Sequence, residues 1–158
     1  GRLIITLYLV ANNLLKKATL YLSDFFEKNR QLYYDNLSIV RMNNNLSQWI
    51  KFFLTGIIET ATKGVATFQN ILKLREEIES NKIISLGKKL PLAKKVLNYL
   101  YKNPIIYSNY LVDELEISKP TANAIINDFI KLNILKEVSG QKRNKLFVFD
   151  KYLDLFKK

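Results

Sequence analysis

Apolar residues recur at helical spacing throughout the first half of the chain. The run from Leu3 to Leu15 is apolar on nearly every side, which predicts a helix buried within a larger domain. Beyond it Ser23 is a suitable helix N-cap, and apolar residues continue at helical spacing as far as Val40. A polar break over 42–45 precedes a further helical pattern over 47–78, which Ser47 opens. Nothing in this half alternates with a period of two residues, so it is predicted to be entirely helical.

The organisation of the chain changes after residue 80. Segment 81–90 mixes small, polar and basic residues and leads to Pro91, which suits the first turn of a helix, so it is predicted to be a linker. The pattern then predicts a helix over 91–101, a short helix over 108–115, a helix over 118–132 capped by Ser118, and a hairpin of 134–138 with 145–149. Three helices followed by a hairpin is the order of the winged helix-turn-helix fold. The predicted fold class is mainly α: a helical bundle over 1–80 and a small α+β winged-helix domain over 91–158.

Two residue types are missing from the chain of 158 residues: cysteine and histidine. Without cysteine there are no disulfides, thiolate nucleophiles or cysteine zinc sites. Without histidine there are no histidine metal ligands and no Ser-His-Asp triad, and the side chain best suited to proton transfer near neutral pH is absent. Glu76, Glu77 and Glu79 are interpreted as a solvated helix face rather than a metal cluster. We therefore predict no metal site and no catalytic residue within this chain.

The chain is basic, with 25 Lys and Arg against 14 Asp and Glu and a net charge of +11. The excess is uneven: residues 1–80 carry 10 basic and 7 acidic residues, and residues 81–158 carry 15 and 7. A positive field attracts anions, so a nucleic-acid partner would belong to the second half. A general abundance of Lys, Asn and Ile accounts for the excess equally well.

The opening apolar run, Leu3–Val10, fits neither a membrane span nor a signal peptide. It ends at Asn12 and Asn13, well short of the roughly 20 residues that a bilayer requires. It also lacks a basic start followed by a small-residue cleavage site. We therefore predict a soluble cytoplasmic protein without a membrane partner.

Helix 118–132 is the candidate recognition helix of the predicted winged domain. Its candidate exposed residues are Lys119, Thr121, Asn123, Asn127 and Lys131. Asparagine pairs with adenine edges, and lysine reaches guanine or phosphate. Asp128 on the same helix would face phosphate unfavourably. Winged helices also serve as packing or dimerisation modules, so a protein partner or a homodimer is the alternative to duplex DNA.

Positive charge is also concentrated at the tip of the predicted hairpin. Lys142, Arg143 and Lys145 lie there on one short polar loop. Such a loop suits phosphate contacts or insertion into the minor groove as a wing. These three residues complete the candidate DNA-binding set.

Two adjacent tyrosines, Tyr33 and Tyr34, stand out in the first half. Neighbours on a helix point about 100° apart, so one ring can enter the core while the other lines a groove. A tyrosine ring stacks, and its hydroxyl forms hydrogen bonds. From the pattern alone, both are interpreted as core residues.

Several short motifs of the first half occur in the order and spacing of one known family. They are Gly1-Arg2-Leu3-Ile4-Ile5, Leu20-Tyr21-Leu22-Ser23, Asn29-Arg30, Tyr33-Tyr34-Asp35-Asn36-Leu37, Val40-Arg41 and Trp49-Ile50-Lys51-Phe52-Phe53-Leu54. In these motifs the first half resembles the Fic domain, in the part that follows that family's catalytic loop. Many Fic proteins append a winged-helix domain, and residues 91–158 resemble that appendage. The resemblance therefore covers the whole chain.

The resemblance implies a protein adenylyltransferase, a nucleotidyltransferase that moves AMP from ATP to a hydroxyl side chain of a target protein. The family's loop reads HPFx(D/E)GNGRxxR, and Gly1-Arg2 fits its end, although this pair could also be a cloning addition. The histidine base, the acidic residue that binds magnesium and the phosphate cradle would lie upstream. ATP and Mg²⁺ are thus the implied cofactors of the intact protein, and this chain is expected to be inactive alone and to need none.

The resemblance leaves a remnant of the nucleotide site in this chain. Arg2 matches the arginine that approaches the terminal phosphate, and Arg41 falls near the site. Tyr33, Tyr34 and Leu37 match positions that line the pocket for the base and ribose. An alternative that needs no upstream segment is a freestanding winged-helix transcriptional regulator with an all-helical, ligand-sensing first half.

Overall fold

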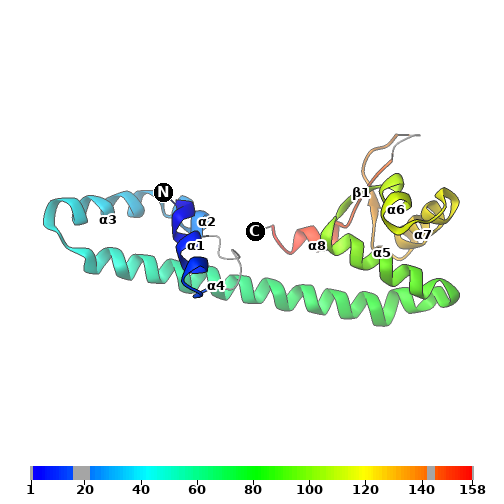
Figure 1. Cartoon of the computed structure of the whole chain (residues 1–158), viewed down its shortest axis with the longest axis horizontal. Coiled ribbons are helices and arrows are strands. Elements are labelled where there is room, and N and C mark those ends of the chain that lie inside the picture. The colour runs from blue at the N-terminus through cyan, green and yellow to red at the C-terminus, as the bar shows by residue number, and fades with distance from the viewer. Residues whose placement is uncertain (1, 16–21, 142–144, 158) are drawn as a thin grey trace. The chain divides into compact units, whose positions relative to one another are not determined.

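The computed structural model describes residues 2–15, 22–141 and 145–157. The protein is mainly helical, with 77% helix and a small three-stranded antiparallel sheet, which confirms the predicted mainly α class (Figure 1). The chain forms two compact units, Gly1–Ala66 and Thr67–Lys158. The division falls within one long helix, whereas the sequence pattern placed the end of the first part at residue 80.

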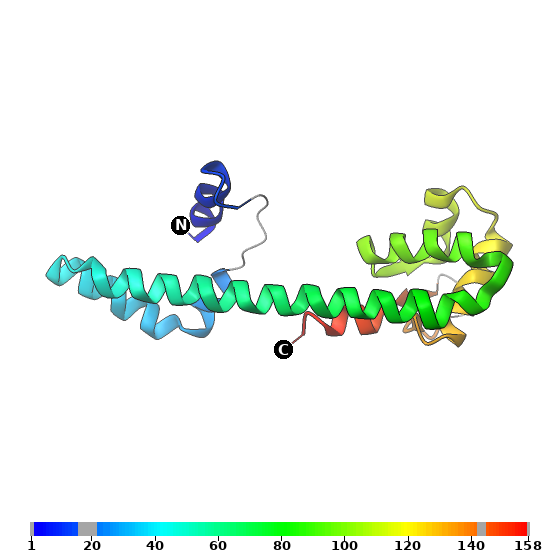
Figure 2. The ribbon, with the colours of Figure 1, turned by 90° about the horizontal axis from the view of Figure 1, so that it is seen from below.

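The first unit is built from helices alone among its described residues. They are α1 (Arg2–Ala11), α2 (Leu22–Lys28), α3 (Arg30–Asn43) and the beginning of α4 (Leu46–Glu77). α3 runs back alongside the beginning of α4 (Figures 1 and 2). Ile4, Leu7 and Tyr8 of α1 are exposed in this structure, so the helix is not buried by the described residues of this chain, and its burial within a larger domain stays a prediction.

The helix ends of this unit differ from the predicted ones. The single helix predicted after Ser23 is divided in two, because the backbone leaves helical geometry at Asn29, with φ −107° and ψ 35°. α2 already begins at Leu22, so Ser23 lies inside the helix and does not cap it. The cap predicted at Ser47 lies two residues after the observed one. The side chain of Asn45 caps α4 instead, since its Oδ1 accepts a hydrogen bond from the backbone N–H of Ser47 at 3.0 Å.

The core of the first unit is mostly aromatic. Its buried residues are Leu22, Phe25, Phe26 and Phe52, against which Ile5, Tyr33, Trp49, Phe53 and Ile57 pack. We call these nine residues the aromatic cluster. The ring of Phe26 is central, with its centroid 5.0 Å from that of Tyr33 and 6.1 Å from that of Phe52. α4 approaches the cluster closely because Gly56 has no side chain: a Cβ there would lie 2.5 Å from the ring of Phe25.

The second unit adds a sheet to its helices. After α4 come the π-helical segment η1 (Ile78–Lys82), the 3₁₀ segment η2 (Ile83–Lys89), α5 (Leu90–Lys102), β1 (Ile105–Tyr107), α6 (Ser108–Leu115), α7 (Lys119–Lys131), β2 (Lys136–Glu137), β3 (Leu146–Val148) and α8 (Asp150–Asp154). The sheet order is β1-β3-β2, and both pairs are antiparallel. Phe147 of β3 lies opposite Ile106 on one side and Glu137 on the other. The core draws on α4, α5, α6, α7 and the sheet.

The segment predicted as a linker, 81–90, is helical in the structure. It forms the end of η1, all of η2 and the first residue of α5. Ile83 is completely buried in the core of the second unit, and Leu86 and Leu90 pack against that core. Gly87 interrupts helical geometry with φ 52°, a left-handed conformation that glycine adopts at little cost, and α5 begins shortly afterwards. The basic and small residues of this segment therefore belong to a helical segment that is packed against the core of the second unit.

The remaining elements of this unit follow the predicted order. α6 covers the predicted 108–115, α7 ends one residue earlier than predicted, and the predicted hairpin is present as β2 and β3. Ser118 caps α7 as predicted, because its Oγ accepts a hydrogen bond from the backbone N–H of Thr121 at 3.3 Å. β1 and α8 were not predicted. β1 has only three residues, Ile105–Tyr107, and it pairs with a strand far along the sequence.

Candidate functional site

The exposed side of α7 presents a polar ridge. Lys119, Asn123, Asn127 and Lys131 are all exposed and lie four residues apart, so they form an oblique row that turns by about 120° around the helix from Lys119 to Lys131. The opposite side of α7 is anchored in the core by Ala122, Ile125, Ile126 and Phe129. Burial of that side fixes the rotation of the helix and turns the polar ridge outward. The structure thus brings four of the five residues predicted on this helix into one row.

Thr121, the fifth residue predicted on this helix, belongs to the helix cap. Its hydroxyl lies 2.8 Å from the Ser118 hydroxyl, within hydrogen-bonding distance, and its backbone N–H donates to the same oxygen. The side chain is exposed but lies off the polar ridge. The Ser-x-x-Thr spacing and the following proline at a helix start were the sequence signals for this role.

Asp128 is the acidic residue that sequence reasoning considered unfavourable on α7. Its Oδ2 accepts a hydrogen bond from the Lys89 ammonium at 2.6 Å, which is also an ion pair. Lys89 closes η2 and lies 39 positions earlier in the chain. The ammonium of Lys89 neutralises the carboxylate charge of Asp128 beside the polar ridge. The charge that the ridge presents to solvent is therefore the positive charge of Lys119 and Lys131.

The hairpin tip is described only in part. Lys142 and Arg143 lie outside the described residues. Lys145 is exposed, and its ammonium lies 2.9 Å from the Glu137 carboxylate across the hairpin. Ser139 holds the start of the loop, since its Oγ accepts a hydrogen bond from the backbone N–H of Leu146 at 3.1 Å. Lys145 therefore stabilises the base of the hairpin, a role that its charge alone did not indicate.

The residues that the family resemblance assigned to a nucleotide site lie in the first unit. Tyr33 is half-buried in the aromatic cluster, whereas Tyr34 is 48% exposed, so the interpretation of both as core residues is wrong for Tyr34. Neighbours on a helix point about 100° apart, and only the side of Tyr33 packs in the cluster. The guanidinium of Arg30 lies 5.9 Å from the centre of the Tyr34 ring, within cation–π range. Leu37 is exposed on the same helix, one turn further on. Arg41 is exposed near the end of α3, and the side chain of Arg2 lies outside the described residues.

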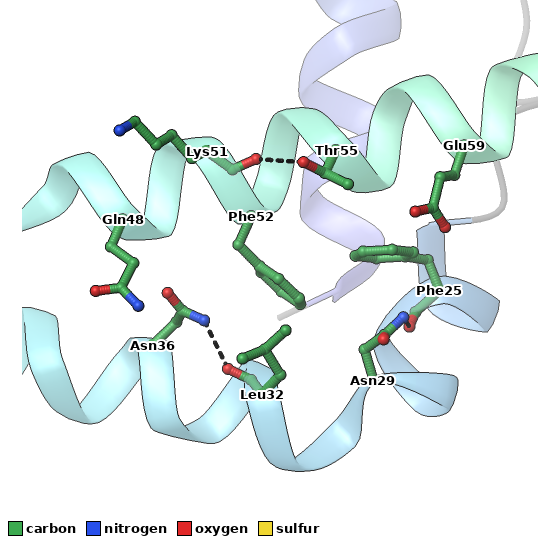
Figure 3. Close-up of a pocket in the computed structure, with 9 residues that line it drawn as sticks. All are labelled: Phe25, Asn29, Leu32, Asn36, Gln48, Lys51, Phe52, Thr55 and Glu59. Atoms are coloured by element: carbon green, nitrogen blue, oxygen red, sulfur yellow. Dashed lines mark hydrogen bonds between the residues drawn. The ribbon is translucent and has the colours of Figure 1, made fainter.

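An open hollow of about 330 Å³ lies between α3 and α4 in the same unit (Figure 3). It is lined by Phe25, Asn29, Leu32, Asn36, Gln48, Lys51, Phe52, Thr55 and Glu59. Figure 3 shows Phe25, Phe52 and Leu32 in its middle and polar side chains around them. Neither Tyr33 nor Tyr34 lines it, so the predicted pocket residues and this hollow occupy different sides of α3.

Asn36 is the residue of this hollow that sequence reasoning missed as a distinct position. Its side chain is only 2% exposed, and its Nδ2 donates to the backbone oxygen of Leu32 at 2.8 Å. Its Oδ1 is buried and has no hydrogen-bond partner among the described residues. The sequence signal for Asn36 was its spacing of seven residues from Asn29, which places the two amides on the same side of the helix.

The described ranges contain neither a cluster of acidic side chains that could hold a metal ion nor a helix of membrane-spanning character. Within residues 2–15, 22–141 and 145–157, no three acidic side chains come together as a metal site. No helix of that part combines the length and the apolar character needed to cross a membrane.

A comparison of the chain with models of known protein families found no match.

Proposed function

We propose that the chain is part of a Fic-type protein adenylyltransferase. The observation that carries this proposal is the convergence of the family-like motifs on one core. Ile5, Leu22, Tyr33 and Trp49 come from four separate motifs, and all four pack in the aromatic cluster. Motifs that share a fold must meet in space, whereas chance matches along a sequence have no reason to do so.

The two tyrosines support the same proposal. A pocket for a nucleotide base needs an aromatic face that is both accessible and held in place. Tyr34 offers the accessible ring, and its neighbour Tyr33 anchors the helix, with its ring 5.5 Å from that of Trp49. Arg30 adds a positive charge beside this ring, which suits a phosphorylated ligand.

In the proposed reaction a hydroxyl oxygen of the target protein attacks the α-phosphorus of ATP, and the bond to pyrophosphate breaks. The hydroxyl proton passes to a general base, which in the Fic family is a histidine. This chain contains no histidine, so its own contribution is to bind and orient the base and ribose. Mg²⁺ would supply stabilisation of the negative charge on the phosphates. The resemblance assigns that ion to an acidic residue of the family's loop, and within the described residues no three acidic side chains come together as a metal site.

Transfer of a labelled AMP group tests this proposal. The chain is incubated with ATP labelled at the α-phosphate, Mg²⁺ and a protein extract, and we expect no labelled protein. The same polypeptide extended upstream in its own reading frame should contain a His-Pro-Phe loop and label a target. Labelling by the 158-residue chain alone, or an upstream frame without such a loop, would overturn the proposal.

A substitution refines the test in the extended protein. Tyr34→Ala should raise KM for ATP, because it removes the accessible ring. Met42→Ala is the matched control, since Met42 is an exposed apolar side chain of the same helix away from the two tyrosines. Equal KM values in both variants would argue against the role of Tyr34.

We further propose that the second unit is a winged-helix module that binds duplex DNA. The order α5-β1-α6-α7-β2-β3, with β3 between β1 and β2, supports this assignment. The polar ridge of α7 is the specific observation in favour of DNA, because the ion pair of Asp128 with Lys89 leaves it without a bare negative charge. Asn123 and Asn127 would read adenine edges in the major groove, and Lys119 and Lys131 would contact phosphate or guanine.

The salt dependence of binding tests this second proposal. Binding of a fluorescent duplex is measured by anisotropy at several salt concentrations. We expect Lys131→Ala to weaken binding and to reduce the slope of log K against log salt by about 0.9. Lys157→Ala is the matched control, because Lys157 is exposed, paired with Asp154 and outside α7.

The possible outcomes separate the candidate functions. Unchanged affinity and slope in both lysine variants would overturn the DNA assignment and leave the second unit as a protein-binding module. DNA binding together with a reading frame that lacks the histidine loop would favour a freestanding transcriptional regulator.

A further inference from the structure

The hollow between α3 and α4 has an apolar middle and a polar group at each end. Figure 3 shows the rings of Phe25 and Phe52 and the side chain of Leu32 in its middle. The amide of Asn36 lies at one end, and the carboxylate of Glu59 lies at the other. All of its lining residues belong to the first unit, so the hollow is formed within a single unit. Its volume of about 330 Å³ is that of a site for a small molecule.

The amide oxygen of Asn36 lacks a hydrogen-bond donor. Asn36 is 2% exposed, and the bond from its Nδ2 to the backbone oxygen of Leu32, at 2.8 Å, fixes the orientation of the amide. The Oδ1 atom is buried and accepts no hydrogen bond from any described residue. A buried acceptor in this state lowers the stability of the fold, and it gains free energy when a ligand supplies the missing donor.

The side chain of Gln48 lies beside this oxygen without bonding to it. Gln48 is exposed and extends from α4 toward Asn36 (Figure 3). It forms no hydrogen bond within the part of the chain that the structure describes. An exposed side chain without such a bond changes rotamer rapidly and at little cost. A ligand can therefore reach the Asn36 oxygen by displacing Gln48, whose own amide oxygen then accepts a second hydrogen bond from it.

The opposite end of the hollow suits a cation. Figure 3 shows the carboxylate of Glu59 pointing toward the ring of Phe25. Glu59 is exposed and has no hydrogen bond or ion pair with another described residue. Lys51, the lining residue of opposite charge, turns its ammonium away from the hollow (Figure 3). A carboxylate next to an aromatic ring attracts an ammonium group, because the ion pair and the cation–π interaction act together.

A ligand that fits both ends is elongated and carries N–H donors at its two ends. The Asn36 oxygen and the Glu59 carboxylate are both acceptors, so neither end suits a carboxylate or a phosphate. Asn29 lines the hollow seven residues before Asn36, a distance over which α3 rises about 10 Å. The phenylalanine rings and Leu32 between the ends favour a chain of methylene groups.

We propose that the hollow binds a linear aliphatic diamine. One ammonium group pairs with Glu59, the methylene chain covers the rings of Phe25 and Phe52, and the second ammonium group donates to the Oδ1 of Asn36. This inference rests on neither of the proposed functions, because neither tyrosine of the candidate nucleotide site lines the hollow and α7 belongs to the other unit. A small ligand in an open hollow is expected to bind in the millimolar range.

A pair of matched ligands tests whether both ends of the hollow take part. Hexamethylenediamine and hexylamine are titrated separately into the full chain by isothermal titration calorimetry. The two molecules share one methylene chain, and hexylamine lacks the second ammonium group. We expect the diamine to bind about tenfold more tightly, because it alone makes both charge-assisted hydrogen bonds. Absence of diamine binding through the millimolar range, or equal affinities for the two ligands, would overturn the proposal.

Substitutions at the two ends locate the site. Asn36→Leu and Glu59→Gln should each weaken diamine binding about tenfold, because each removes one of the two acceptors. The matched controls are Asp35→Leu on α3 and Glu76→Gln on α4, which are exposed and outside the hollow and should bind the diamine as the wild type does.

Circular dichroism checks that each variant is folded. Glu59 is exposed, so Glu59→Gln keeps the test valid even if Asn36→Leu disturbs the packing. Unchanged affinity in a folded Asn36→Leu variant or in Glu59→Gln would overturn the proposal. An equal loss in the controls would also overturn it, since it would show that diamines bind the carboxylates of this chain without preference.

Discussion

The two units of this chain bury their apolar residues to very different extents. Among the described residues of the second unit, seventeen apolar residues are buried in one core, to which helices and strands contribute together. Among those of the first unit, four are buried in the core, three of them phenylalanines. Exposed apolar side chains are correspondingly frequent among the described residues of the first unit, as at Leu14, Met42 and Ile58.

This difference teaches what hydrophobic periodicity does and does not determine. Both units have helices with a clear apolar side, and both sets of helices were predicted from that pattern. In the second unit the apolar sides of α5 and α7 contribute to one core, in which Leu97 and Phe129 are both buried. In the first unit, apolar residues such as Ile50 and Leu54 keep about half of their surface exposed. The pattern predicts a helix, but not what covers it.

The largest expected effect is a cavity in the better-packed core. Phe129→Ala removes a fully buried ring and should lower the free energy of unfolding of the second unit by about 3–5 kcal/mol. Hydrogen exchange of α5 and α7 should accelerate, while that of α2 and α3 stays unchanged. The exposed Asn127→Ala serves as the control and should have little effect. Acceleration in both units would show that they unfold together, and the contrast between them would then be lost.

A pair of glycine substitutions on one helix measures the packing of the first unit. Gly56→Ala places a methyl group against the ring of Phe25 and should lower the free energy of unfolding by about 1–3 kcal/mol. Gly64→Ala meets no atom within 4 Å and should raise it by about 0.5–1 kcal/mol, because alanine favours the helix. Urea unfolding followed by circular dichroism gives both values. A Gly56→Ala variant whose free energy of unfolding equals or exceeds that of the wild type would contradict this prediction. It would show that the ring of Phe25 can move away from the added methyl group.

A smaller effect is expected at the buried amide of the first unit. Asn36→Leu removes an oxygen that is buried without a partner and should raise the free energy of unfolding by about 1 kcal/mol. The adjacent open hollow gives the new methyl groups room. The same urea experiment measures the change, with the exposed Asp35→Leu as the control. A loss of stability on Asn36→Leu would show that the amide is needed in the folded state.

The effect expected under the narrowest range of conditions is a pH dependence confined to alkaline solution. Burial raises the pKa of Tyr101 to about 12, against the opposing influence of the Arg75 guanidinium. The folded state thus favours the protonated phenol, and this stabilisation is present below about pH 10 and is lost as the pH rises from 10 to 12. Absorbance at 295 nm should show a late ionisation step that Tyr101→Phe lacks. A titration identical in both proteins would contradict this assignment.

The sequence predicted most of the second unit because its signals there are local. Ser118 and Pro120 mark the start of α7, and the polar turn between two β-branched runs marks the hairpin. The strand β1 was not predicted, because three residues are too few to show an alternation of apolar and polar positions. Its pairing with β3 also depends on residues some 40 positions away. Segment 81–90 was misread because Gly87 and its basic neighbours resemble a linker, whereas burial of Ile83 is decided by tertiary packing.

The candidate sites were predictable to a smaller extent. The spacing of Lys119, Asn123, Asn127 and Lys131 could be read as one row from the sequence, since it follows from helix geometry alone. The ion pair of Lys89 with Asp128 could not, because it joins side chains from distant parts of the chain. The exposure of Tyr34 could not be predicted either, because it depends on which side of α3 packs in the aromatic cluster.

The aromatic cluster also makes the first unit optically distinct. Trp49 is the single tryptophan of the chain, and its ring lies within 5.5 Å of Tyr33 and 5.9 Å of Phe52. Light absorbed by Tyr33 will therefore reach the indole by energy transfer, and the emission will report on the environment of this unit alone. The second unit has tyrosines and no tryptophan. One fluorimeter and one unlabelled sample are thus enough to follow the first unit while circular dichroism follows both.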